Sequence, residues 1–271
     1  MLVAQLTDLH IKQGGKLAYK KVDTLKCLQR AVTHINRLVP KPDCTVITGD
    51  LGDFGTDAEY EIIHRELRKF TMPVHIVPGN HDHRDNLRCS LSSIAAFDHD
   101  TYCNFVQHYG NQCLIGLDSS VIGQPYGELS NETLEWLQQT LLANAEYQVT
   151  IFVHHPPMTV GLGHMDVQNL RNADALFEVL TSCRTLQGIV VGHLHRPISA
   201  MWRGIPVWVG PSHSHSVTLD LNDNAPSSFS MEPPMIRLLS LTGDGVTSHL
   251  SYIEHSQGPY PFFDENKNLI D

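Results

Sequence analysis

The sequence lacks the features that would suit it to a membrane, to a disulfide framework or to a nucleic-acid polymer. No apolar stretch approaches the roughly 18 residues needed to cross a bilayer, and the opening MLVAQLTDLH lacks the basic segment of a signal peptide. The six cysteines show no CxxC spacing, which is typical of reduced thiols in a cytoplasm. A formal net charge of −10 argues against DNA or RNA as a partner. We therefore expect a cytoplasmic protein without a membrane or nucleic-acid partner.

The pattern of apolar residues predicts an α/β fold. Through the first two-thirds of the chain, short β-branched runs alternate with helical patterns, as in layered α/β proteins with a parallel or mixed sheet. The expected strands are 2–7, 44–48, 74–77, 113–118, 149–153 and 188–191, and the expected helices are 22–39, 57–69, 130–142 and 169–180. Beyond residue 195 the pattern changes to short strands at 198–202, 205–209, 216–221 and 235–241, with a polar, Pro/Ser-rich loop at 221–234.

Oxygen-bearing and imidazole side chains directly follow five of the predicted strands. The motifs TDLH, TGDLGD, PGNHD, FVHHPP and GHLH supply Asp8, His10, Asp50, Asn80, His81, Asp82, His154, His155, His193 and His195. Each motif alone has an ordinary explanation as a turn, a cap or a local hydrogen bond. Five such strand ends together favour a ligand site beyond the carboxyl ends of the strands, and imidazole is a preferred ligand of transition metals.

Local geometry supports this interpretation. Asp8 and His10 are two residues apart, so in an extended chain they would point the same way. Gly49 and Gly79 would allow tight turns that carry Asp50 and Asn80 over the edge of the sheet.

Two other stretches offer a rival metal site. HDHRDN, at 81–86, nearly matches the HxHxDH pattern of the metallo-β-lactamase fold, but Asn86 replaces its last histidine. SHSH, at 212–215, supplies imidazoles without carboxylates nearby. Neither pattern accounts for the other strand ends.

In the order DxH, GD, GNHD, HHPP and GHxH, the five motifs resemble those of the calcineurin-like metallophosphoesterases. LVAQLTDLH, DAEY, IVPGNHD, FVHHPPM and GPYPFFDEN further resemble the class III cyclic-nucleotide phosphodiesterase group, and especially its bacterial glycerophosphodiesterase branch. The resemblance implies a four-layer α/β/β/α sandwich. It implies a catalytic domain formed by 1–195 and 254–271, and a small β-rich dimerisation and substrate-pocket subdomain at 196–253. A homo-oligomer follows, and apolar residues of that subdomain such as Met201, Trp202, Val207, Trp208, Ile236 and Leu238 are its expected interface.

The resemblance also implies two divalent metal ions, drawn from iron, zinc, manganese and cobalt. The first ion would be bound by Asp8, His10, Asp50 and His195, and the second by Asp50, Asn80, His154 and His193. Two such ions lower the pKa of an attacking water and neutralise charge on the attacking and leaving oxygens of a phosphodiester.

Several histidines lie outside this implied ligand set. His81 and His215 would hydrogen-bond the phosphoryl oxygens and protonate the leaving alkoxide, and Asn80 would also contact the substrate. His215 is matched by spacing in GPSHSHSV, where the family usually has one histidine, which leaves His213 unassigned. His83 and His155 are expected to pack or to support the ligands.

The activity implied is hydrolysis of a small phosphodiester. Glycerophosphodiesters are the first expectation, and 3′,5′-cyclic nucleotides are the alternative. A third possibility of another class is a metal-free scaffold that uses this fold for protein contacts. Such scaffolds usually lose ligands, whereas all seven expected ligands are present here.

Overall fold

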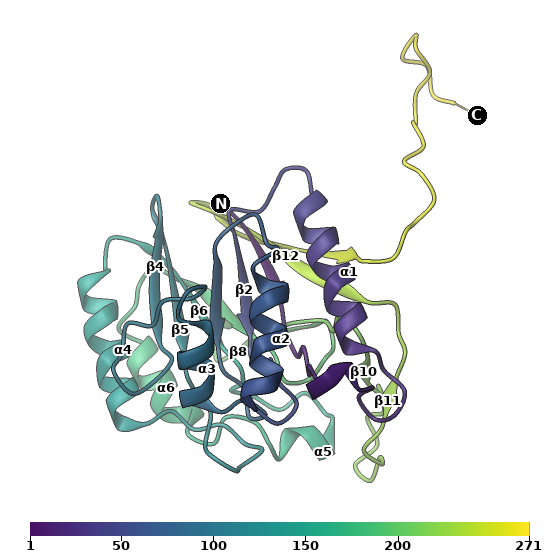
Figure 1. Ribbon diagram of the computed structural model, residues 1–271. Coiled ribbons are helices and arrows are strands. Elements are labelled where there is room, and N and C mark those ends of the chain that lie inside the picture. Colours follow the sequence, from purple (N-terminus) through teal and green to yellow (C-terminus); the bar gives the residue numbers. More distant parts are fainter. Residues whose placement is uncertain (271) are drawn as a thin grey trace.

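Two β-sheets stack face to face in the computed structural model, which describes residues 1–270, and helices cover the outer face of each sheet (Figure 1). The five-stranded sheet has the order β13 (Gly245–Tyr252), β12 (Met235–Thr242), β1 (Leu2–Leu6), β2 (Cys44–Thr48), β3 (Val74–Val77). The six-stranded sheet has the order β4 (Phe105–Tyr109), β5 (Gln112–Leu117), β6 (Gln148–Val153), β7 (Leu186–Val191), β9 (Ile205–Val209), β8 (Ile198–Trp202). Strands β1, β2 and β3 run parallel, as do β5, β6, β7 and β9.

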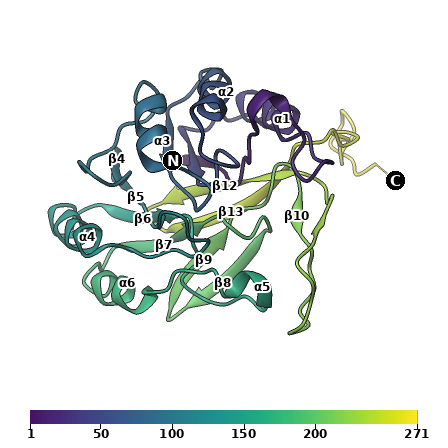
Figure 2. The same ribbon diagram turned by 60° about the horizontal axis from the view of Figure 1, so that its bottom comes forward.

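Helices α1 (Thr24–Arg37), α2 (Asp57–Leu67) and α3 (Arg84–Leu91) lie on the five-stranded sheet, and α4 (Asn131–Ala143) and α6 (Ala173–Leu180) lie on the six-stranded one (Figure 2). Two short helices, η1 (Gln13–Gly15) and α5 (Gly163–Asp166), lie in connecting loops. Between the sheets, Val46, Phe105, Leu114, Phe152 and Val190 are fully buried. Since the inner strands are covered on both faces, they read as continuous apolar runs. The expected four-layer α/β/β/α fold is confirmed.

The helix starts are set by local hydrogen bonds. Ser130 caps α4 by accepting from the Thr133 amide at 3.0 Å, at the start of the helix expected over 130–142. The helix expected at 169–180 begins only at Ala173, because Asn172 uses its side-chain amide to bond both backbone polar groups of Leu129. Sequence analysis did not anticipate α3, β4 or β13.

The β-rich stretch after residue 195 is built into both sheets rather than standing apart. Strands β8 and β9 form one edge of the six-stranded sheet, while β12 and β13 form one edge of the five-stranded sheet. Only β10 (Ser216–Val217) and β11 (Phe229–Ser230) form a separate two-stranded ribbon, so the expected strand at 216–221 is much shorter than predicted.

This placement changes the argument for an interface in 196–253. Val207 and Ile236 are fully buried within the chain and Trp202 is 7% exposed, whereas Met201 is 67% exposed. Most of the apolar surface that suggested a partner is therefore used in packing the protomer's own sheets. The domain division and the oligomer interface stay predictions.

Residues 254–270 leave the sheets after β13 and are exposed along their length (Figure 1). They carry large exposed apolar side chains, including Tyr260, Phe262 and Phe263. Among residues 1–270, no helix combines the length and the apolar character needed to cross a bilayer.

Candidate metal centre

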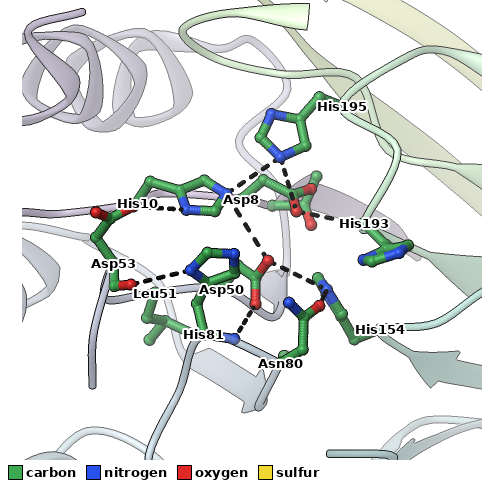
Figure 3. A network of polar contacts seen from close by, with 12 residues as sticks. Asp8, His10, Asp50, Leu51, Asp53, Asn80, His81, His154, His193 and His195 are labelled. Atoms are coloured by element: carbon green, nitrogen blue, oxygen red, sulfur yellow. Dashed lines mark hydrogen bonds and ion pairs between the residues drawn. The ribbon is translucent and has the colours of Figure 1, made fainter. Parts of the chain in front are cut away.

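The polar residues predicted from five strand ends meet at one edge of the two sheets (Figure 3). From the five-stranded sheet come Asp8 and His10 after β1, Asp50 after β2, and Asn80 with His81 after β3. From the six-stranded sheet come His154 after β6, and His193 with His195 after β7. His215 reaches the same cavity from the segment before β10. The structure thus brings all seven predicted ligands together with His81 and His215.

Five of these side chains project from a left-handed backbone, namely Asp8 (φ 56°), His10 (46°), Asp50 (52°), His193 (70°) and His195 (51°). Each such non-glycine conformation costs on the order of 1–3 kcal/mol, and clusters of them mark functional sites. The expectation that Asp8 and His10 converge in an extended chain was wrong, because they converge through this turn.

The two glycines have different tasks. Gly49 has φ 97° and allows the turn before Asp50, as expected. The expected turn at Gly79 is present, closed by the Asp82 amide donating to the Gly79 carbonyl at 3.3 Å, but Gly79 itself is not left-handed. A Cβ there would lie 2.1 Å from the Asp50 carboxylate oxygen Oδ1. Gly79 therefore allows the two loops to approach closely.

The first group of ligand atoms comes from Asp8, His10 and His195, which lie within 4.8 Å of one another. The Nε2 atoms of His10 and His195 are 3.1 Å apart, and His195 Nε2 is 3.3 Å from Asp8 Oδ1. Asp50 Oδ2 lies 3.7 Å from His10 Nε2. Two imidazole nitrogens and two carboxylates facing one small space are the donor set of a divalent cation.

The second group lies on the other side of Asp50. His154 Nε2 is 3.4 Å from Asp50 Oδ2 and 3.2 Å from Asn80 Oδ1, and the His193 ring centroid is 5.1 Å from that of His154. His193 Nε2 and Asp8 Oδ2 are buried without a hydrogen-bond partner. Unpaired buried polar atoms are costly, and a bound cation would satisfy both. The residues present therefore fit a pair of ions that share Asp50.

The ring nitrogens facing away from this space are held by other groups. His154 Nδ1 donates to the Thr48 carbonyl at 2.7 Å, and His195 Nδ1 donates to the His215 carbonyl at 3.2 Å. His10 Nδ1 lies 3.3 Å from Asp53 Oδ1. Such contacts fix the tautomer and turn Nε2 toward a metal. Asp53 is not among the residues predicted for the site, although it is the second aspartate of the TGDLGD motif.

Asp82, the last residue of the PGNHD motif, holds two loops of the site together. Its carboxylate accepts from the amides of Leu51, Gly52 and Gly79 at 2.9–3.1 Å and from the Tyr60 hydroxyl at 2.9 Å. It thus joins the loop that carries Asp50 to the loop that carries Asn80.

The buried charges of the site call for a cation. Burial raises the pKa of Asp8 to about 6, with a further increase from Asp50 and an opposing effect of His154. Burial also acts to raise the pKa of Asp50, but His154 and His81 hold it well below its usual range. Burial opposes protonation of His154, yet Asp50 and Asp8 raise its pKa to about 9. In the metal-free site a proton on His154 balances the carboxylates.

His81 and His215 differ in their surroundings. His81 Nδ1 donates to the Asp53 carbonyl at 2.9 Å, which leaves Nε2 for the cavity. Burial and then His195 lower the pKa of His215 to about 2, so its imidazole is neutral and suited to hydrogen bonding.

The three unassigned histidines have structural positions. His155 is buried, with Nδ1 2.7 Å from Ser119 Oγ and its ring 4.9 Å from that of His193. His213 is buried, and burial lowers its pKa to about 4. His83 is exposed and caps α3 by accepting from the Asn86 amide, so the HxHxDH interpretation is wrong.

A cavity of about 450 Å³ opens above these residues. One side is formed by α5 and the residue shortly after it, through His164, Met165 and Gln168. Tyr19 and the ribbon of β10 and β11 form another part of the lining.

Comparison with known proteins agrees with this geometry. The sequence profile described as calcineurin-like phosphoesterase matches residues 1–197. The chain belongs to this family. Its members use a dinuclear divalent metal centre, which the Asp and His clusters fit.

Among its relatives, the chain is 41% identical over 273 residues to a probable glycerophosphodiester phosphodiesterase GpdQ of Arcobacter nitrofigilis, with 100% of both chains covered. It is 30% identical over 208 residues to the 3′,5′-cyclic adenosine monophosphate phosphodiesterase CpdA of Vibrio vulnificus, covering 77% of this chain and 74% of that protein. A dimetal phosphatase from Danio rerio has a similar structure, with a TM-score of 0.68 at 16% identity, covering 94% of this chain and 96% of that one.

Proposed function

We propose that this protein is a metal-dependent phosphodiesterase that hydrolyses small phosphodiesters, with glycerophosphodiesters as its preferred substrates. The observation that carries the proposal is the pair of ligand groups on either side of Asp50. The relative from Arcobacter nitrofigilis, at 41% identity, bears the name of a probable glycerophosphodiester phosphodiesterase, whereas relatives named as cyclic-nucleotide phosphodiesterases, such as those of Rhodopseudomonas palustris and Vibrio vulnificus, are 32% and 30% identical.

In this proposal, Asp8, His10, Asp50 and His195 hold one ion, and Asp50, Asn80, His154 and His193 hold the other. Two divalent ions there would lower the pKa of a water and neutralise charge on the attacking and leaving oxygens. Iron, zinc, manganese and cobalt all suit these oxygen and nitrogen ligands.

The remaining steps belong to the chain's own side chains. Asn80 and the neutral imidazole of His215 orient the phosphoryl oxygens by hydrogen bonds. His81, whose Nδ1 is engaged by the Asp53 carbonyl, holds a proton at Nε2 and donates it to the oxygen of the leaving alcohol. We further propose that the protein acts in the cytoplasm as a homo-oligomer.

The test is hydrolysis by protein stripped of metal and then reloaded with Mn²⁺, Co²⁺, Zn²⁺ or Fe²⁺. We expect no hydrolysis before reloading, restored hydrolysis after it, and a higher kcat/KM for glycerophosphocholine than for 3′,5′-cyclic AMP. Faster hydrolysis of cyclic AMP would favour the alternative substrate class. Full activity without metal would refute the mechanism, and a metal-loaded protein without diesterase activity would favour the scaffold alternative.

A further inference from the structure

Tyr19 is a large aromatic residue that lies outside the hydrophobic core. It is 54% exposed, and it lies in a turn where both Tyr19 (φ 49°) and Lys20 (φ 58°) are left-handed. The turn is closed by two backbone hydrogen bonds of 2.9 Å between Ala18 and Val22. Two adjacent strained non-glycine residues that hold a large ring toward a cavity indicate a use for that ring.

The Tyr19 ring forms an aromatic corner with His215 and Phe229. The ring centroids are 5.2 Å apart for Tyr19 and His215, 5.1 Å for Tyr19 and Phe229, and 5.4 Å for His215 and Phe229. The His215 ring stands at 71° and 77° to the other two. The three come from separate parts of the chain, and Figure 1 shows the ribbon of β10 and β11 beside the segment that precedes α1. All three rings line the cavity above the candidate metal centre.

His215 connects this aromatic corner to the candidate metal centre. Its ring centroid is 4.7 Å from that of His195 and 5.9 Å from that of His10. A group attached to a metal-bound phosphate through a short alkyl link would therefore reach the corner.

The charge of the cavity selects among such groups. Among the described residues that line it, none is a lysine or an arginine, so no permanently cationic side chain would repel an ammonium group bound at the corner. Gln168, which also lines the cavity, donates its side-chain amide to the His164 carbonyl at 2.9 Å, which leaves its own oxygen as an acceptor. Faces of aromatic rings attract ammonium groups, and quaternary ammonium ions are commonly bound by such rings.

We propose that the corner of Tyr19, His215 and Phe229 binds the ammonium group of a phosphodiester whose alcohol is choline or ethanolamine. This inference rests on the proposed phosphodiesterase function and assigns the substrate class within it. Tyr19 and Phe229 are then specificity-determining residues, since their rings contact the alcohol and not the phosphate.

The experiment compares glycerophosphocholine with its 3,3-dimethylbutyl analogue, in which carbon replaces the nitrogen and the shape is kept without the charge. Wild-type protein should hydrolyse the choline ester with a kcat/KM about tenfold higher, the size expected of a partly desolvated cation–π contact. Glycerophosphoethanolamine, assayed in parallel, shows whether the methyl groups contribute.

Matched variants assign the preference to the rings. Tyr19→Leu, Phe229→Leu and their combination keep an apolar surface without an aromatic ring, so the ratio of kcat/KM for the choline ester to that for the neutral analogue should fall to about twofold or less. Tyr19→Phe should keep the preference. Tyr252→Leu is the control, because Tyr252 is 52% exposed on β13 and does not line this cavity.

Equal kcat/KM values for the two esters in the wild type, or an undiminished preference in the double variant, would overturn the inference. If neither ester nor bis(p-nitrophenyl) phosphate were hydrolysed by metal-loaded protein, the proposed function would fail instead. Titration calorimetry with the two intact esters would then still decide, because equal Kd values would refute the role of the corner.

Discussion

Asp82 offers the sharpest test of how the loops of the candidate metal centre are held. In Asp82→Asn, the NH2 of a side-chain amide replaces one carboxylate oxygen. If the remaining oxygen still accepts hydrogen bonds from the Gly52 amide and the Tyr60 hydroxyl, this NH2 faces the Gly79 amide, and two donors then meet. An unpaired buried amide costs about 1–3 kcal/mol, and the remaining bonds lose their charge-assisted strength. We therefore expect the free energy of unfolding to fall by about 2–4 kcal/mol.

The effect should extend to metal binding. Since the Gly79 loop carries Asn80 and the Leu51 loop carries Asp50, displacement of either one disturbs the second ligand group, and we expect about 10–100-fold weaker binding there. Urea unfolding of the metal-free protein and metal titration calorimetry measure the two effects. Asp85→Asn is the control, because Asp85 is an exposed residue in the first turn of α3. Wild-type stability and metal affinity in Asp82→Asn would refute the positioning role.

Four further predictions concern other parts of the molecule. Asp50→Ala should lose both ions, because that carboxylate lies beside His10 of the first group and His154 of the second; metal analysis that still finds a full complement would contradict the shared ligand. His81→Ala should keep its metal but slow alkyl diesters far more than p-nitrophenyl diesters, which scarcely need a general acid; equal slowing would count against a proton-donating role. Burial lowers the pKa of His75 to about 4, so below the ordinary pKa of 6.5 the unfolded chain binds a proton that the folded chain does not, and stability falls as the pH falls. His75→Phe should therefore lose less stability than wild type between neutral pH and about pH 4, by up to about 3 kcal/mol in urea unfolding of the metal-free protein; an identical pH slope would exclude this cause. Light scattering over a dilution series should show an oligomer, and a fully active monomer at every concentration would leave the interface unsupported.

Sequence patterns predicted the strands that carry the site because these strands are covered on both faces. Every residue of β2 is buried, and its apolar run ends abruptly at Gly49 and Asp50. Because each of these apolar runs ends sharply, the sequence shows where the strand stops, and the polar residues that follow are the ligand candidates. By contrast, α3 is short and polar, and β13 has a mostly exposed or half-buried face, so neither gave a clear periodic signal.

The residues that support the site were harder to find from sequence. Asp53 and Asp82 act through contacts with residues far away in the chain or through backbone amides, and local spacing contains no information about such contacts. The aromatic corner was also hidden, because its three rings, Tyr19, His215 and Phe229, come from separate segments of the chain. It also depends on a left-handed turn at Tyr19 and Lys20, and the sequence Tyr-Lys does not predict such a turn.

Each ligand group of the candidate metal centre combines residues from both sheets, and this has a mechanical consequence. Asp8, Asp50 and Asn80 belong to one half of the sandwich, while His154, His193 and His195 belong to the other (Figure 3). Two bound ions would act as a cross-link between two halves that otherwise adhere through an apolar layer, to which one sheet contributes Val46 and Val77 and the other Leu114 and Phe152. Separation of the halves would have to break metal–ligand bonds as well as expose that apolar layer, so each ion bound raises the free energy of opening the sandwich. Conversely, a substitution that loosens the packing between the sheets, even far from any ligand, would lower the affinity for the ions.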